Sequence, residues 1–121
     1  MDNHALRRSF IAFHVTLGVV VLIESLATVL HASGLGSAQP SNLGLAWFAG
    51  AEVLAALLFL WPSTLRIGAW SLLAIFMAAL AFHGLHGEWP LTLLVYGVGV
   101  VLVMVHGSAF GKGHVKPSAA T

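Results

Sequence analysis

Two carboxylates, Glu24 and Glu52, stand in stretches of sequence that are otherwise apolar. On insertion scales an ionisable residue at the middle of a membrane-spanning helix costs about 2.5 to 3.5 kcal/mol, so one that is kept there usually marks a functional site. Thr28 and His31 follow Glu24 by four and seven residues, which places all three on one helix face. The spacing predicts a polar stripe that faces neighbouring helices rather than lipid.

Further groups that bind protons are predicted to gather near the same membrane face. His83 and His86 are three residues apart and share a helix face, and Glu88 follows in a turn. The predicted proton-handling and ligand pocket consists of Glu24, Glu52, Thr28, His31, His83, His86 and Tyr96.

The elements that hold these residues are predicted to be membrane spans. Hydrophobic residues make up 59% of the 121 positions and charged residues 7%, whereas about 25% of residues are charged in a soluble domain. Four apolar runs, at residues 10–31, 43–61, 65–85 and 91–106, approach the ~20 residues that cross a hydrocarbon layer as a helix. We expect an all-α fold, an integral membrane antiparallel four-helix bundle, in which residues 1–121 form a single membrane domain.

The boundaries between the runs are marked by polar residues, glycine and proline at 33–42, 61–64 and 86–90. Connections this short favour antiparallel neighbours. Residues 107–121 are rich in Gly, Ser, Ala and Lys and are predicted to form a flexible C-terminal tail.

Basic residues predict the orientation in the membrane. All five of them fall on one predicted face: Arg7, Arg8, Arg66, Lys112 and Lys116. The positive-inside rule then makes both termini cytoplasmic, in a bacterial-type inner membrane. Basic residues this few and scattered argue against a nucleic-acid partner. The sequence contains no cysteine, which excludes disulfides and thiol relays within this chain.

The middle of the chain resembles a known family. Residues 50–60, 64–73, 77–78 and 81–83 are similar to the second and third spans of the DoxX-like family of small four-helix membrane proteins. Glu52, Arg66, Gly68 and His83 match the family pattern position by position.

The first span resembles the family more loosely. Arg7 or Arg8 and Gly18 fit its pattern, whereas Glu24, Ser25 and His31 replace the small-residue and lysine feature that commonly ends this span.

The resemblance implies a role in membrane redox systems, which for this family include a quinone-linked thiosulfate oxidation complex. We therefore expect a small membrane subunit of a redox complex, with Glu24 and Glu52 as proton carriers and a quinone as ligand. Tyr96 or Trp70 would pack against the quinone ring. No residue carries electrons by itself, so we expect no catalytic activity from the chain alone. The expected partners are the lipid bilayer and other membrane subunits, or further copies of the chain.

Other functions stay open on the sequence alone. His14 with His106, or His31 with His83 or His86, has the paired placement that a haem b electron-transfer protein needs. A small proton-coupled transporter shares the span count and Glu24, although the one-sided positive charge speaks against it. A structural or assembly subunit of a larger membrane complex is a further alternative.

Two readings concern the polar residues themselves. Weak candidates for a Zn or Cu site are His31, His83, His86 and Glu88, because imidazole and carboxylate groups bind these metals. In the alternative without a ligand, the polar groups satisfy one another, for instance Glu24 with Thr28 or with Glu52, and fix the helix packing.

Overall fold

The computed structural model describes residues 3–35 and 40–106, and this part of the chain is all-helical. Its helices are α1 (Asn3–Ala32), α2 (Leu43–Leu60), α3 (Leu65–Leu85) and α4 (Leu91–Val105). The predicted flexible tail 107–121, with Lys112 and Lys116, lies outside the described residues. The prediction of an all-α fold is confirmed.

Local signals in the sequence end the helices where the predicted connections lie. The Asn42 side chain accepts a hydrogen bond of 3.1 Å from the main-chain N–H of Leu45, which caps the first turn of α2. Pro62 follows the end of α2, and Pro90 immediately precedes α4. Gly87, between α3 and α4, has a φ of 80°, a conformation that favours glycine.

Three of the helices, α1, α2 and α3, are long and apolar enough to cross a membrane. Large apolar side chains midway along them face outward, with exposed fractions of 61% for Ile23, 60% for Leu54 and 65% for Met77. A large contiguous apolar surface of this kind is typical of contact with lipid, so the chain is a membrane protein. The fourth predicted span is shorter: α4 has 15 residues, or about 22 Å at 1.5 Å per residue.

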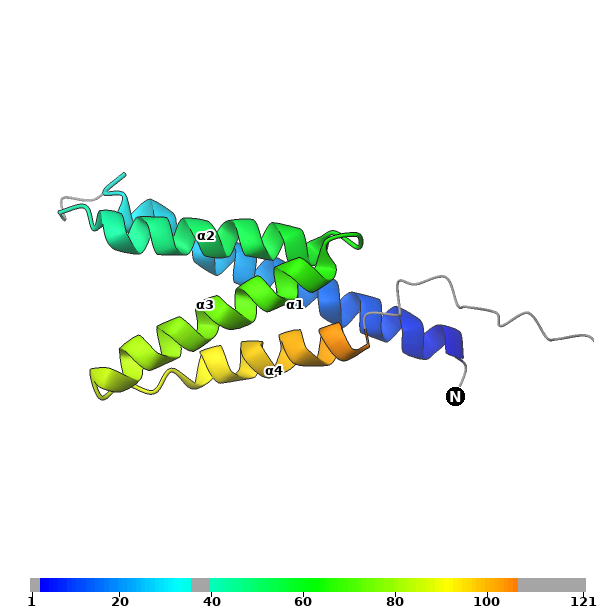
Figure 1. The fold of residues 1–121 in the computed structure, drawn as a ribbon. Helices are drawn as coiled ribbons and strands as arrows, with labels where there is room; N and C mark the ends of the chain where they lie inside the picture. The colour runs from blue at the N-terminus through cyan, green and yellow to red at the C-terminus, as the bar shows by residue number, and fades with distance from the viewer. Residues whose placement is uncertain (1–2, 36–39, 107–121) are drawn as a thin grey trace, which may run out of the picture.

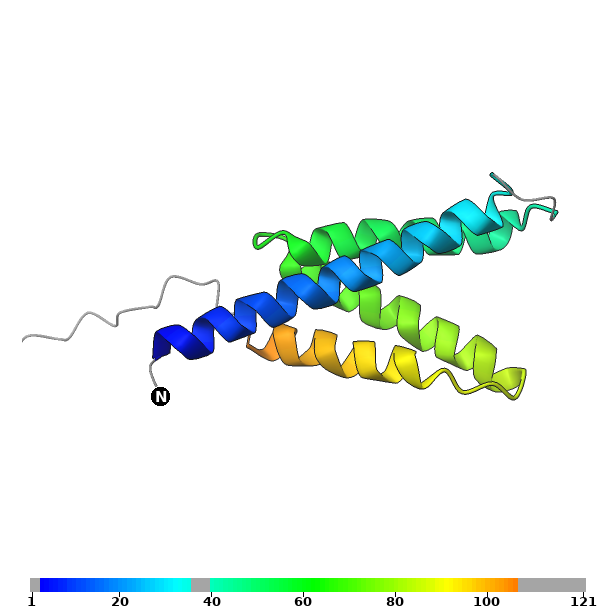
Figure 2. The ribbon, with the colours of Figure 1, turned by 180° about the vertical axis from the view of Figure 1, so that it is seen from behind.

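Successive helices run in opposite directions, as Figures 1 and 2 show. The start of α1, the α2–α3 turn and the end of α4 lie at one end, called here the basic end because it carries Arg7, Arg8 and Arg66. The α1–α2 and α3–α4 connections lie at the other. The pair α1 and α2 and the pair α3 and α4 diverge toward this second end, which we call the open end (Figure 1).

Close packing in the half nearer the basic end explains the divergence. A Cβ atom on Gly68 of α3 would collide with the main chain of Phe59 in α2, and one on Gly18 of α1 would collide with the side chain of Leu60. Only glycine permits an approach this close. Most of the buried core lies at and around this level: Leu17, Val21, Ala55, Ala56, Phe59, Leu65, Ala69, Leu72, Val100 and Val103. The helix pairs are therefore held together near the basic end and separate beyond it.

His14 joins α1 to the end of α2. Its ring is fully buried, lies edge-on to the Phe59 ring at a centroid distance of 4.6 Å, and donates from Nε2 to the Phe59 carbonyl at 2.9 Å. That carbonyl belongs to the last turn of α2, where intrahelical donors run out. Thr64 completes the same turn by donating to the Leu58 carbonyl at 2.8 Å. His14 therefore has a structural role in this fold.

Candidate functional site

A hydrogen bond between Tyr96 and Glu24 connects the two diverging helix pairs. The Tyr96 hydroxyl of α4 donates to Oε1 of Glu24 in α1 over 3.0 Å. These residues are 72 positions apart in the sequence. Glu24 is otherwise exposed, so this phenol is a polar partner for a carboxyl group that lies within an apolar helix.

Glu52 of α2 joins the same group. Its carboxyl is hydrogen-bonded to the Ser25 side chain of α1 and is close enough to Glu24 for the two charges to interact. The Ser25 hydroxyl also donates to the Val21 carbonyl at 2.7 Å. Because a hydroxyl has one proton and two acceptor positions, Ser25 can still accept a hydrogen bond from a protonated Glu52 while it holds Val21.

Glu24, Ser25, Glu52 and Tyr96 thus form one polar group from three helices, called here the carboxyl cluster. Two neighbouring carboxyl groups share protons readily, because like charges close together oppose the ionisation of both. The cluster can accept a proton, release one, or hydrogen-bond the oxygen of a bound molecule. Because Glu24 is exposed, the cluster is accessible from one side.

A cavity of about 550 Å³ lies between α2 and α3 toward the open end. This outer cavity is lined by Asn42, Leu45, Phe48, Ala78, Ala79, Phe82 and His83. Its volume falls within the range of about 300 to 1,000 Å³ that is usual for small-molecule sites. Its lining of apolar walls with a few polar groups is also typical of such sites. Glu52 follows Phe48 by one helical turn on the same face of α2, so the carboxyl cluster lies just beyond the inner end of the cavity.

The two histidines predicted to act together have different partners. His83 borders the outer cavity, and its Nδ1 lies 3.3 Å from Oε2 of Glu88. His86 instead donates from Nδ1 to the Phe82 carbonyl at 2.8 Å. Of this pair, His83 is the one that the structure places at the cavity.

Two other predicted site residues lie away from the cluster's side chains. The Thr28 hydroxyl donates to the main-chain carbonyl of Glu24 at 2.9 Å, a bond within the helix, rather than to the Glu24 carboxyl. His31 is exposed in the last turn of α1. The members of the predicted stripe, Glu24, Thr28 and His31, thus do not share one set of partners.

The metal and haem alternatives gain no support from the geometry. Within residues 3–35 and 40–106, no three His, Cys, Asp or Glu side chains are grouped so that they could hold a metal ion. His14 uses Nε2 on the Phe59 carbonyl. His106 donates from Nδ1 to the Leu102 carbonyl at 3.0 Å and packs against the Phe10 ring. Both histidines of the predicted haem pair thus form hydrogen bonds with carbonyl groups in the last turns of helices.

Several residues of the site were not among the predicted ones. Asn42 appeared in the sequence only as part of a polar connection, and Phe48 and Phe82 as ordinary apolar residues. The spacing of Phe48 and Glu52, one helical turn apart, is the signal that could have joined the cavity to the carboxylate. Ser25 stands next to Glu24 but faces a different helix.

Comparison of the chain with protein-family models, with curated proteins and with solved structures finds no match. The resemblance to DoxX-like proteins therefore stays a prediction, and the functional argument rests on the geometry of this chain.

Proposed function

We propose that this protein is a quinone-binding membrane subunit of a redox complex, with the quinone ring in the outer cavity and the carboxyl cluster beside it. The observation that carries the proposal is the outer cavity itself, which combines aromatic walls, His83 at its border and a carboxylate one helical turn further in. Its volume of about 550 Å³ suits a small ring with substituents.

The lining of the outer cavity fits the chemistry of a quinone ring. Phe48 and Phe82 offer aromatic faces from two helices, and rings pack favourably in offset or edge-on contacts. The Oδ1 atom of Asn42 already accepts from Leu45, so its NH₂ group remains to donate to a quinone carbonyl. When both ring nitrogens of His83 are protonated, Nδ1–H donates to Glu88 and Nε2–H is a second donor for the quinone.

Proton transfer would involve groups on both sides of the ring. Oxidation of a quinol releases a pair of electrons and a pair of protons. In this proposal, Glu52 accepts a proton from the quinol into the carboxyl cluster, of which it is a member. His83 accepts the other proton and passes it to Glu88 at the open end. The electrons pass to a redox partner, because the side chains of this chain do not carry them.

The same proposal includes the orientation. Arg7, Arg8 and Arg66 share the basic end, which the positive-inside rule assigns to the cytoplasm of a bacterial-type inner membrane. With α4 as a fourth, short span, both termini are cytoplasmic. Since the sequence has no cysteine, Ser63→Cys and Ser41→Cys introduce single thiols at opposite ends, both at exposed serines. A thiol reagent that cannot cross the membrane should label Ser41→Cys alone in intact cells, and labelling of Ser63→Cys instead would reverse the orientation.

Quinone binding is tested with an azidoquinone, whose photoreactive group is on the ring, and with protein reconstituted in lipid nanodiscs. We expect saturable labelling of peptides that contain Phe48 or Phe82. Loss of one hydrogen-bond donor at the border of the outer cavity, in His83→Leu, should weaken labelling by about tenfold. The control Thr92→Val changes a polar residue of α4 outside the cluster and the outer cavity. Labelling of the wild type that does not saturate, or that spreads over the lipid-facing surface, would contradict the proposal.

The partner is tested by purification in a mild detergent. A redox subunit should co-purify with a redox enzyme that accepts the electrons of a quinol, and the rate of quinol oxidation by this complex should fall when Glu52→Leu replaces the wild type. Co-purification with a complex whose activity does not change would favour the assembly-subunit alternative.

A further inference from the structure

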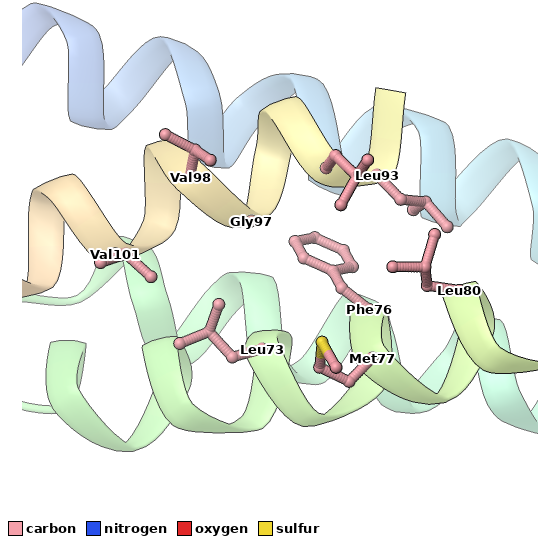
Figure 3. A pocket seen from close by; sticks show the side chains of 9 residues that line it. Leu73, Phe76, Met77, Leu80, Leu93, Gly97, Val98 and Val101 are labelled. Atoms are coloured by element: carbon pink, nitrogen blue, oxygen red, sulfur yellow. The ribbon is translucent and has the colours of Figure 1, made fainter. Parts of the chain in front are cut away.

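A second recess, the groove between α3 and α4, is apolar throughout its lining (Figure 3). Its volume is about 310 Å³, and its walls include Leu73, Met77 and Leu80 of α3 and Leu93, Val98 and Val101 of α4. These residues lie nearer the middle of the helices than those of the outer cavity. The groove is therefore placed at the depth of the hydrocarbon layer.

Gly97 keeps the groove open. It lines the groove from α4, and no heavy atom lies within 4 Å of the position that a Cβ atom would take there. A side chain at this position would project into space that is now empty. Glycine in a helix interior costs about 1 kcal/mol relative to alanine, so the residue that leaves this space empty also lowers the stability of α4.

Phe76 lies beside both the groove and the carboxyl cluster. Phe76 lines the groove and projects from α3 into the space between the two helices (Figure 3). Its ring lies 6.4 Å from the ring of Tyr96, which bonds Glu24. Phe76 is 4% exposed, so its ring is almost fully enclosed. The groove and the polar site thus meet at the contact between Phe76 and Tyr96.

We propose that the groove between α3 and α4 holds the hydrocarbon tail of the quinone whose ring occupies the outer cavity; this inference rests on the function proposed above. The two recesses differ in polarity, as the polar ring and the apolar tail of a quinone do. The outer cavity has Asn42 and His83 near the open end, whereas the groove is apolar and lies deeper. A tail that leaves the ring beside the carboxyl cluster would reach the groove by displacing the Phe76 ring.

Affinity alone is a poor test of this site, because lipid is as apolar as the groove and a tail gains little by moving between them. The location of the tail is the decisive quantity. We therefore choose a quinone with a decyl tail that ends in a photoreactive diazirine, bound to full-length protein in nanodiscs. Adducts are expected in residues 73–80 and 93–101, with saturation and with competition by the same quinone lacking the diazirine.

A matched pair of variants tests the groove. Gly97→Leu fills the groove and should reduce tail labelling of α3 and α4 by about fivefold or more, because the tail and the leucine together would overpack it. Gly50→Leu is the control, since Gly50 of α2 also has no heavy atom within 4 Å of its Cβ position but lies outside the groove. Labelling by the azidoquinone ring should stay unchanged in both variants.

The outcomes separate the two proposals. Ring labelling in the outer cavity together with tail labelling spread evenly over lipid-facing residues overturns the tail site and leaves the proposed function intact. Equal tail labelling of Gly97→Leu and Gly50→Leu also overturns the tail site and leaves the proposed function intact. Absence of saturable ring labelling in the wild type contradicts the proposed function and the tail site with it. Groove labelling that excess unlabelled quinone fails to reduce identifies a general lipid groove and also overturns the proposal.

Discussion

The approach of α3 to α2 at Gly68 can be tested by the addition of one methyl group. A Cβ atom there would overlap the main-chain N and Cα atoms of Phe59 and the carbonyl carbon of Leu58. Main-chain atoms inside a helix cannot rotate away, so Gly68→Ala must push α3 off α2. Overpacking costs about 1 to 3 kcal/mol, and we expect the upper end of that range because the clash is with main chain. Alanine regains about 1 kcal/mol of helix propensity, which leaves a net loss of about 2 kcal/mol.

Other glycines of the chain provide graded controls. A Cβ on Gly50 has no heavy atom within 4 Å, so Gly50→Ala should stabilise the protein by about 0.5 to 1 kcal/mol. Gly18→Ala should fall between the two, because its clash is with the flexible side chain of Leu60. The free energy of unfolding should therefore differ by about 3 kcal/mol between Gly50→Ala and Gly68→Ala.

The assay is unfolding of purified protein in mixed dodecyl maltoside and SDS micelles, followed by far-UV circular dichroism. A second readout connects the crossing to the site. If α3 shifts relative to α2, the walls of the outer cavity move apart and azidoquinone labelling near Phe48 and Phe82 should fall in Gly68→Ala but not in Gly50→Ala. Equal stability of Gly68→Ala and Gly50→Ala would refute the close crossing and the origin proposed for the divergence.

Two further substitutions test polar contacts by the same unfolding assay. In a double-mutant cycle of Tyr96→Phe and Glu24→Leu we expect a coupling energy of about 1 kcal/mol, and additive effects would mean that the hydrogen bond is absent in the folded protein. His14→Ala should cost about 2 kcal/mol because it leaves the buried Phe59 carbonyl without this donor. His14→Gln, which keeps an N–H donor, should recover part of that loss, and a variant as unstable as His14→Ala would argue against the bond.

The sequence predicts the helix ends well because the signals are local. Asn42 caps α2, and the prolines at 62 and 90 mark the ends of helices without reference to the rest of the fold. The start of α1 at Asn3 was not predicted, because residues 3–9 are too polar to belong to an apolar run yet still form helix. The fourth run, predicted at residues 91–106, agrees with α4 within one residue, and at 15 residues this helix is the shortest of the four.

The candidate site was predictable in depth but not in its pairings. Hydropathy and residue count give the level of Glu24 along its helix, but they do not give the rotation of α4 that brings Tyr96 to it. The partner of His14 is a main-chain carbonyl, which no side-chain pattern in the sequence can indicate. The outer cavity depends on the angle between helices, and that angle follows from a contact at Gly68 many residues away.

The position of Glu52 follows from that same contact. In the antiparallel pair, residue 59 meets residue 68, so residue 52 lies roughly opposite residue 75, two turns nearer the open end. Closer to the crossing, the interior is filled by Phe59, Ala56 and Leu72, all without measurable exposure, and a carboxyl group there would have to displace them. Beyond residue 52 the two helices separate around the outer cavity. Glu52 thus stands where α1 supplies Ser25 as a partner and where α2 and α3 begin to separate around the outer cavity, which is the position that the proposed proton exchange with a ligand would require.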